Sequence, residues 1–177
     1  TKCIILEENY LDLQFFPESG ELVHGLPGVL GFKALDSAGK GKTVEGEIVN
    51  SKEEVIARFS SNALGMGTAW LARADSNEHY MARVKSVAGS IEAKRLYHLP
   101  KVVSKGNILS VTGTPETIQV NVSSNYLKED SVSVRISCRG VVYFDIKGRL
   151  KNGLLRFALP GINLPEGVIA FTLMDNS

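Results

Sequence analysis

The segment SVSVRISC, residues 131–138, alternates without interruption between polar and apolar side chains. Successive side chains of a β-strand point to opposite faces, so Val132, Val134, Ile136 and Cys138 share one face. The serines and Arg135 share the other face. A strand with one apolar and one polar face belongs to a sheet that covers a core on one side and meets water on the other.

The same two-residue period recurs along most of the chain, with turn-forming residues between the apolar runs. Asp36-Ser37-Ala38-Gly39, Lys147-Gly148 and Lys151-Asn152-Gly153 are predicted turns, and the Asn-Gly pair suits the positive φ of a tight hairpin. Regularly spaced short strands are typical of β-sandwiches and barrels. We therefore predict an all-β protein with further strands around 11–15, 30–34, 44–49, 67–72, 80–84, 118–122, 142–146, 155–159 and 168–174.

The segment from Ser51 to Phe59 fits two kinds of secondary structure. Ser51-Lys52-Glu53-Glu54 matches a helix capping box, and Val55, Ile56 and Phe59 follow at helical spacing. The segment is short and lies between predicted strands, which favours a strand. A short helix stays open as the alternative.

The alternation fades between residues 86 and 100. Glu92-Ala93-Lys94-Arg95 leads there to Leu99-Pro100, and a proline interrupts a strand ladder. We place a domain boundary in this stretch and predict two consecutive immunoglobulin-like β-sandwich domains, residues 1–96 and 97–177.

Composition narrows the classes of partner. Twenty Lys and Arg residues against 19 Asp and Glu give a net charge of +1, which argues against nucleic acid as a partner. No apolar run approaches the roughly 20 residues of a membrane-spanning helix, so we expect no membrane insertion by this segment.

The chain begins at Thr1 without a methionine or signal peptide, so we expect a processed or trimmed piece. Cys3 and Cys138 lie far apart and are expected to be unpaired apolar thiols.

The motifs that would carry nucleotide or metal chemistry are incomplete. Residues 36–43, DSAGKGKT, end like a phosphate-binding loop, but Asp36 replaces the first glycine and the loop lies between strands instead of opening a helix. The histidines His24, His79 and His98 have no spacing that would place two of them on one metal. We predict no metal and no cofactor.

The motifs of hydrolases are incomplete as well. Val87-Ala88-Gly89-Ser90-Ile91 only partly resembles a nucleophile elbow. The acidic pairs Glu7-Glu8, Glu53-Glu54 and Glu129-Asp130 are adjacent in sequence, so in strands their side chains point to opposite faces. We predict no catalytic residue and no enzymatic activity.

Two further features bear on binding. Asn121-Val122-Ser123 fits the acceptor pattern for N-glycosylation but lies within a predicted strand, so we discount it. Trp70, flanked by small residues in a predicted strand, is expected in the core. If Trp70, Tyr80, Tyr97, Tyr126 and Tyr143 instead formed one exposed strip, sugar binding would be favoured.

A longer motif points to a family. Residues 13–27, LQFFPESGELVHGLP, continuing to Gly31-Phe32-Lys33-Ala34, resemble a motif of macroglobulin domains in the α2-macroglobulin family. Similar copies occur in large exported proteins of Bacteroidetes-type bacteria, some with a TonB-dependent receptor plug domain. Gly65-Met66-Gly67 and the closing segment 164–175 resemble further parts of such domains. Ser19 departs from the usual second glycine.

The resemblance implies a role without catalysis. The thioester sequence Gly-Cys-Gly-Glu-Gln of the family is absent, so covalent trapping of proteases is not expected of this chain. The resemblance implies a structural or protein-binding domain pair in a larger exported cell-envelope protein, in the periplasm or at the outer-membrane surface. Its partners would be other domains of the same polypeptide, or a protein or peptide that adds a strand to a sheet edge. The alternative is a carbohydrate-binding module or accessory domains of a surface glycan-uptake system.

Overall fold

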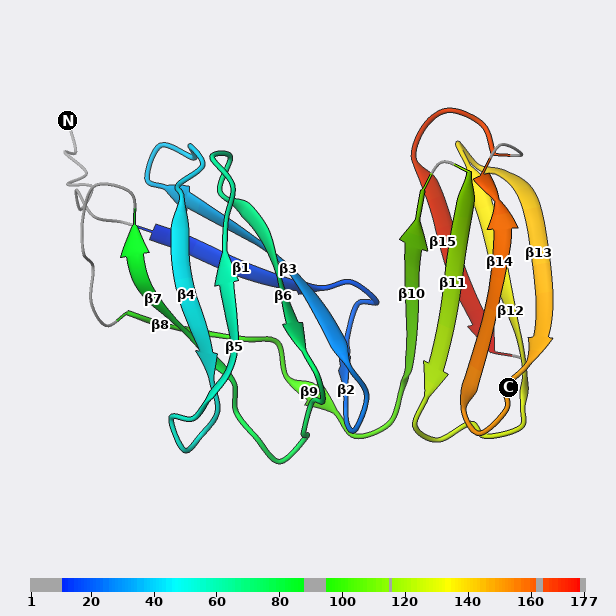
Figure 1. Ribbon diagram of the computed structural model, residues 1–177, viewed down its shortest axis with the longest axis horizontal. Coiled ribbons are helices and arrows are strands. Elements are labelled where there is room, and N and C mark those ends of the chain that lie inside the picture. Colours follow the sequence, from blue (N-terminus) through cyan, green and yellow to red (C-terminus); the bar gives the residue numbers. More distant parts are fainter. Residues whose placement is uncertain (1–10, 88–94, 115, 162–163, 176–177) are drawn as a thin grey trace, which may run out of the picture. The chain divides into compact units, whose positions relative to one another are not determined.

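The computed structural model describes residues 11–87, 95–114, 116–161 and 164–175, and it shows two compact units (Figure 1). The first unit runs to Ser104 and the second begins at Lys105. Strands make up the regular structure of both units, and the described residues contain no α-helix. The predicted all-β fold class with sandwich domains is confirmed.

The first unit packs two antiparallel sheets against each other. One sheet has the strand order β1-β3-β6 and the other β5-β4-β7-β8, and a short parallel pair, β2 with β9, lies beside them. The bounds are β1 Leu11–Pro17, β2 Leu22–Val23, β3 Gly28–Asp36, β4 Val44–Val49, β5 Val55–Ser60, β6 Met66–Leu71, β7 Met81–Val87, β8 Leu96–His98 and β9 Val102–Val103.

Three phenylalanines join the two sheets of the first unit. Phe15 and Phe32 come from β1 and β3, and Phe59 comes from β5 of the facing sheet. The ring centroid of Phe59 lies 5.5 Å from that of Phe15 and 5.0 Å from that of Phe32, both edge to face. Such edge-to-face contacts are favourable beyond simple burial of apolar surface. The aromatic trio therefore fixes how the sheets of this unit stack.

The boundary between the units falls after Ser104 and not after residue 96 as predicted. The reason lies in two late strands of the first unit. β8 pairs with β7 through Leu96, Tyr97 and His98, and β9 pairs with β2 through Val102 and Val103. Leu99-Pro100 therefore separates two short strands of one unit and does not mark the start of the next.

The second unit is a sandwich of two three-stranded antiparallel sheets, with the strand orders β10-β11-β14 and β13-β12-β15. β11 and β12 occupy the sheet centres, and their inward residues, among them Val120, Val134 and Ile136, are fully buried. The bounds are β10 Asn107–Gly113, β11 Thr117–Ser124, β12 Ser131–Cys138, β13 Val141–Arg149, β14 Leu154–Pro160 and β15 Ile169–Asp175.

The segment after Ser51 forms a turn followed by strand β5, so the helical alternative is wrong. The side-chain oxygen of Asn50 accepts hydrogen bonds from the backbone N–H groups of Lys52 and Glu54, at 3.0 and 2.9 Å. The hydroxyl of Ser51 donates instead to Glu78. Asn50, which lies just before the apparent capping box, thus closes the β4–β5 turn.

Two predictions about turns in the second unit change. Lys147 and Gly148 lie inside β13 and form no turn. The side chain of Leu155 fills the space above Gly148. A Cβ at position 148 would lie 2.6 Å from a methyl carbon of Leu155. Asn152 and Gly153 take φ values of 51° and 79°, as predicted for an Asn-Gly turn. They connect β13 and β14, which belong to different sheets and so form no hairpin.

Candidate functional site

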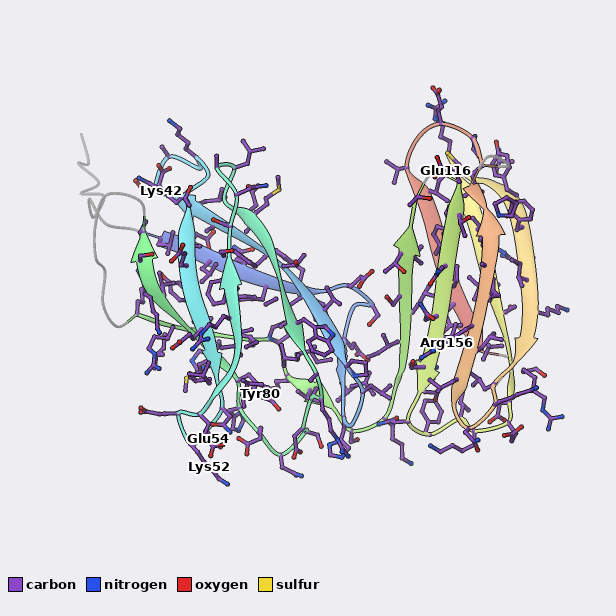
Figure 2. All side chains as sticks on the ribbon, viewed as in Figure 1. Lys42, Lys52, Glu54, Tyr80, Glu116 and Arg156 are labelled. Carbon is purple, nitrogen blue, oxygen red and sulfur yellow. The ribbon has the colours of Figure 1, made fainter. Side chains whose placement is uncertain are left out.

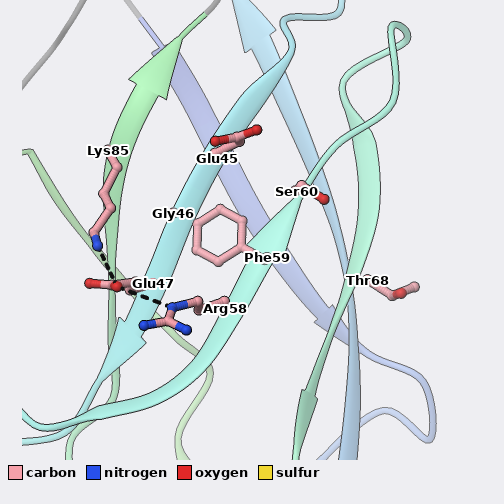
Figure 3. A pocket seen from close by; sticks show the side chains of 8 residues that line it. All are labelled: Glu45, Gly46, Glu47, Arg58, Phe59, Ser60, Thr68 and Lys85. Carbon is pink, nitrogen blue, oxygen red and sulfur yellow. Dashed lines mark hydrogen bonds and ion pairs between the residues drawn. The ribbon is translucent and has the colours of Figure 1, made fainter.

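A polar recess of the first unit is lined by residues of strands β4, β5, β6 and β7. Its volume is about 350 Å³, and Glu47 of β4 lies in it with only 4% of its side chain exposed. Figure 3 shows the Glu47 carboxylate between the side chains of Lys85 and Arg58. The residues that line the recess are Glu45, Gly46, Glu47, Arg58, Phe59, Ser60, Thr68 and Lys85.

Strand register brings three cations to Glu47. Arg58 of β5 and Arg83 of β7 are the cross-strand partners of Glu47, and a nitrogen of each lies 3.4 Å from its carboxylate. A bulge in β7 leaves Lys85 as an extra residue between those paired with Glu45 and Gly46. A bulge redirects a side chain, and here the Lys85 ammonium lies 2.5 Å from the Glu47 carboxylate.

This cluster holds its carboxylate in the charged form. The hydrogen bond from Lys85 lowers the pKa of Glu47, and the bonds from Arg83 and Arg58 add to it, while burial acts in the opposite direction. A carboxylate that stays ionised and already accepts three charged donors is poorly suited to deliver a proton. The arrangement is that of a structural ion cluster that ties β4, β5 and β7 together.

A second recess of about 280 Å³ contains two of the three histidines, His79 and His98, beside Glu78 and Tyr80. His24 lies elsewhere: its Nδ1 accepts a hydrogen bond from the Ser76 N–H at 3.1 Å and lies 3.4 Å from an Asp75 oxygen. Among the described residues, no group of three or more His, Cys, Asp or Glu side chains is arranged to hold a metal ion.

The segment that ends like a phosphate-binding loop is the connection between β3 and β4. The Asp36 carboxylate accepts hydrogen bonds from the backbone N–H groups of Ala38 and Lys40, at 3.0 and 2.9 Å. The bond from Lys40 is the main reason why the pKa of Asp36 is lowered. The side chain that replaces the first glycine thus closes the turn. Lys42, the last lysine of this segment, lies just before β4, whereas Lys52 and Glu54 lie beyond the other end of that strand (Figure 2).

The structure also shows where Asn121, Cys138 and Val87 lie. Asn121 lies within β11, as predicted, and Cys138 is a free thiol buried on the inner face of β12. Val87 ends β7. Cys3, the pair Glu7-Glu8, the rest of the elbow-like segment and residues 92–94 lie outside the described residues.

Trp70 is exposed, so the prediction that it lies in the core is wrong. Its side chain is 61% exposed on the outer face of the β1-β3-β6 sheet, because its neighbours Ala69 and Leu71 point inward and are buried. Phe16 and Met66, 54% and 45% exposed, lie on the same outer face. The alternation of β6 carried this signal, since two inward neighbours oblige the residue between them to point outward.

The tyrosines do not extend this face into one strip. Tyr80 is buried, and its hydroxyl oxygen accepts a hydrogen bond from the Asp75 N–H at 3.0 Å. Tyr97 is half-buried and donates its hydroxyl to the Leu11 carbonyl. Tyr126 and Tyr143 are exposed on the second unit, where Tyr126 lies in the β11–β12 turn and Tyr143 near the β12–β13 turn. Because these turns lie at the two ends of β12, the tyrosines share no surface.

The Glu47 cluster was not found from the sequence. Its three cations lie 11, 36 and 38 residues further along the chain, and only the register of β4 with its two neighbours brings them together. Two charged residues within the apolar run VEGEIV were the available signal. Within the described residues, no helix is long and apolar enough to span a membrane.

Comparisons with known proteins gave weak structural likenesses. No protein-family model and no curated protein matches the sequence. Solved structures that resemble it include the native α2-macroglobulin of E. coli, at 14% identity and a TM-score of 0.35, over 89% of this chain and 12% of that one. A DUF4785 family protein of Legionella pneumophila has 14% identity and a TM-score of 0.35, over 93% and 52%. The adhesin InvE of Yersinia pseudotuberculosis has 12% identity and a TM-score of 0.32, over 92% and 58%. The chain thus spans between 12% and 58% of the length of these proteins.

Proposed function

We propose that this chain is a non-catalytic pair of structural or protein-binding domains within a larger exported protein of the bacterial cell envelope. The observation that carries the proposal is the tandem of two β-sandwich units, each with its own apolar core. Domains of this kind space or present other parts of a polypeptide, and their sheet edges receive extended segments of partners.

The state of the polar residues supports a role without catalysis. Glu47, the most buried carboxylate described, is ionised and engaged by three cations. Asp36 and Glu78 each accept hydrogen bonds from backbone N–H groups of nearby turns. These groups stabilise strands and turns of the first unit. The macroglobulin-like motif of residues 13–34 supports the exported, envelope-associated setting.

Fractionation of the source bacterium tests this setting. An antibody raised against the recombinant chain is expected to detect its antigen in the periplasmic or outer-membrane fraction. Detection only in the cytoplasmic fraction, with marker proteins correctly distributed, would contradict the proposal.

Carbohydrate binding is the second candidate, and the exposure of Trp70 favours it. An exposed indole on a sheet face, with Phe16 exposed on the same face, offers apolar surface on which a sugar ring can stack. A glycan array with the wild-type chain and the Trp70→Ala variant tests this. Binding that is lost in Trp70→Ala but kept in Tyr143→Ala, an exposed aromatic of the second unit, would establish the sugar site. No glycan signal with the wild type would leave the structural role in place.

A further inference from the structure

The Glu47 cluster carries more positive charge than its carboxylate neutralises. Arg58, Arg83 and Lys85 surround Glu47, and the exposed Glu45 is the other carboxylate that lines the recess. Three cations against two carboxylates leave one positive charge. A single further carboxylate would therefore make this site neutral.

The arginines of the cluster keep most of their hydrogen-bond donors unused. An arginine offers five N–H donors in a planar fork. Arg58 gives Glu47 only its Nε and Arg83 gives it one terminal nitrogen, each at 3.4 Å. Strong charge-assisted bonds are shorter, roughly 2.7–2.9 Å. The terminal nitrogens of Arg58, whose side chain is 80% exposed, therefore remain available to a ligand.

Strand register sets these groups on the face of the sheet that points away from the core. Arg58, Glu47 and Arg83 lie opposite one another across β5, β4 and β7. Phe59 and Ala82, their neighbours along β5 and β7, belong to the core of the first unit, so alternation turns the arginines outward. The two arginines thus flank Glu47 on one accessible face.

Apolar side chains adjoin this charged row. Leu96 of β8 is the cross-strand partner of Arg83 and is 47% exposed. Val55 of β5, 43% exposed, pairs with Val49, which follows Glu47 by two residues on the same face. A ligand that matches both features carries a carboxylate beside apolar groups. An acidic residue between apolar residues of a peptide has this chemistry, whereas an acidic sugar is polar on all sides.

We propose that this recess binds an aspartate or glutamate side chain from an apolar segment of a partner protein. The proposal rests on the proposed role of the chain as a protein-binding domain pair. The terminal nitrogens of Arg58 and the ammonium of Lys85, both of which line the recess, hold the carboxylate of the partner. Glu47 orients these cations and reduces their mutual repulsion.

Glu45 limits the charge that the recess accepts. It precedes Glu47 by two residues on β4, which is about 7 Å along a strand, so it repels a bound anion. One carboxylate balances the site, whereas a doubly charged phosphate would leave an excess of negative charge. Removing the charge of Glu45 should therefore tighten binding.

NMR titration of the ¹⁵N-labelled chain with the capped peptide acetyl-Val-Glu-Val-amide tests the site. The backbone amides of Glu47, Arg58 and Lys85 are expected to shift with this peptide and not with its glutamine counterpart, acetyl-Val-Gln-Val-amide. The affinity is expected to fall several-fold at about 0.5 M NaCl, because salt screens the charges of an open recess.

Three variants separate this site from a general charge effect. Arg58→Gln should weaken peptide binding by about fivefold or more, since it removes the fork that holds the carboxylate. The matched control Arg156→Gln removes an exposed arginine from β14 of the second unit and should bind like the wild type. Glu45→Gln should tighten binding by about threefold, the effect of one unit charge at about 7 Å in water. All three positions are exposed, and circular dichroism checks that each variant folds.

The proposal is overturned if the glutamate peptide causes no shifts, if the glutamine peptide binds equally well, or if Arg58→Gln binds like either the wild type or Arg156→Gln. Unchanged affinity in Glu45→Gln would also contradict it. A titration with trigalacturonate tests the kind of partner: shifts at the recess with this acidic sugar and none with the peptide would exclude a protein partner for this site. The fractionation result that tests the envelope setting does not depend on any of these outcomes.

Discussion

Replacing Gly46 of β4 with alanine should destabilise the first unit, because the new methyl group has no room. A Cβ built at Gly46 lies 2.3 Å from Cζ of Phe59 and 2.7 Å from the carbonyl oxygen of Arg83. The Arg83 oxygen belongs to the backbone of the neighbouring strand β7. The Phe59 ring is held against Phe15 and Phe32 at 5.5 and 5.0 Å, so neither neighbour can move freely.

The size of the effect follows from overpacking of a core. Forcing an extra methyl group into a well-packed interior costs about 1–3 kcal/mol. For a domain of roughly 100 residues, a loss of about 2 kcal/mol lowers Tm by roughly 8–16 °C. We expect a shift of this size for Gly46→Ala.

Thermal unfolding followed by tryptophan fluorescence measures this shift. Trp70 is the only tryptophan of the chain and lies in β6 of the same unit, so its emission reports on the first unit. The matched control is Gly31→Ala in β3, where the nearest atom to an added Cβ is the Phe16 carbonyl oxygen at 3.7 Å. This control should be neutral or stabilising by up to about 1 kcal/mol, since an alanine orders more easily than a glycine in a strand.

A second variant identifies the atoms responsible. Phe59→Leu removes the ring atoms that the Gly46→Ala methyl group would meet. The double variant should therefore lose less stability than the sum of the two single variants, by at least about 0.5 kcal/mol. The reasoning is refuted if Gly46→Ala melts together with Gly31→Ala, or if the two single effects simply add.

Three further predictions concern the ion cluster, the aromatic residues and a turn. The pKa of Glu47 is lowered in the folded protein, so its ionised form stabilises the fold above its ordinary value of 4.5, and this contribution is lost as the pH falls through the lowered pKa. Urea titrations between pH 7 and pH 2 should show the stability advantage of wild type over Glu47→Gln shrinking below about pH 4.5; an advantage that does not change with pH contradicts the ion cluster. Trp70→Ala should change stability by less than about 0.5 kcal/mol, whereas Phe59→Ala should cost about 3–5 kcal/mol in the same denaturation assay; equal losses would mean that Trp70 is not exposed. Gly153→Ala should lower the Tm of the second unit in calorimetry, because residue 153 has φ = 79° and an added Cβ would lie 2.4 Å from the Ser124 carbonyl oxygen; an unchanged Tm would contradict this turn geometry.

The sequence alone determined strands with clear alternation, because side-chain alternation is a local property of an extended chain; it did not predict β10 or the short strands β2, β8 and β9. SVSVRISC forms β12 with its four apolar residues inward, and the segment before Pro17 forms β1 with Phe15 buried and Phe16 exposed. Asn152 and Gly153 take the positive φ values that their types allow. Each of these features depends on neighbouring residues only, and so the sequence was enough to predict them.

Tertiary structure decided which strands are neighbours, and with that the sites. Glu47 meets Arg58, Arg83 and Lys85 only because β4 lies between β5 and β7 and because a bulge turns Lys85 toward it. The boundary after Ser104 depends on β9 pairing with β2, whose residues lie about 80 positions earlier. Such pairings join distant parts of the chain, and the period of a strand does not specify its partner.

The same distinction applies to the surfaces. Alternation places Trp70 outward once Ala69 and Leu71 are known to be inward, but only the packed core shows that the two smaller side chains fill the space between the sheets. The sequence likewise shows that residues 169–174 of β15 carry no charge, while sheet order alone shows that this strand lies at an edge. Local chemistry therefore determined what each strand presents, and long-range packing determined whether it is presented to the core, to another strand or to solvent.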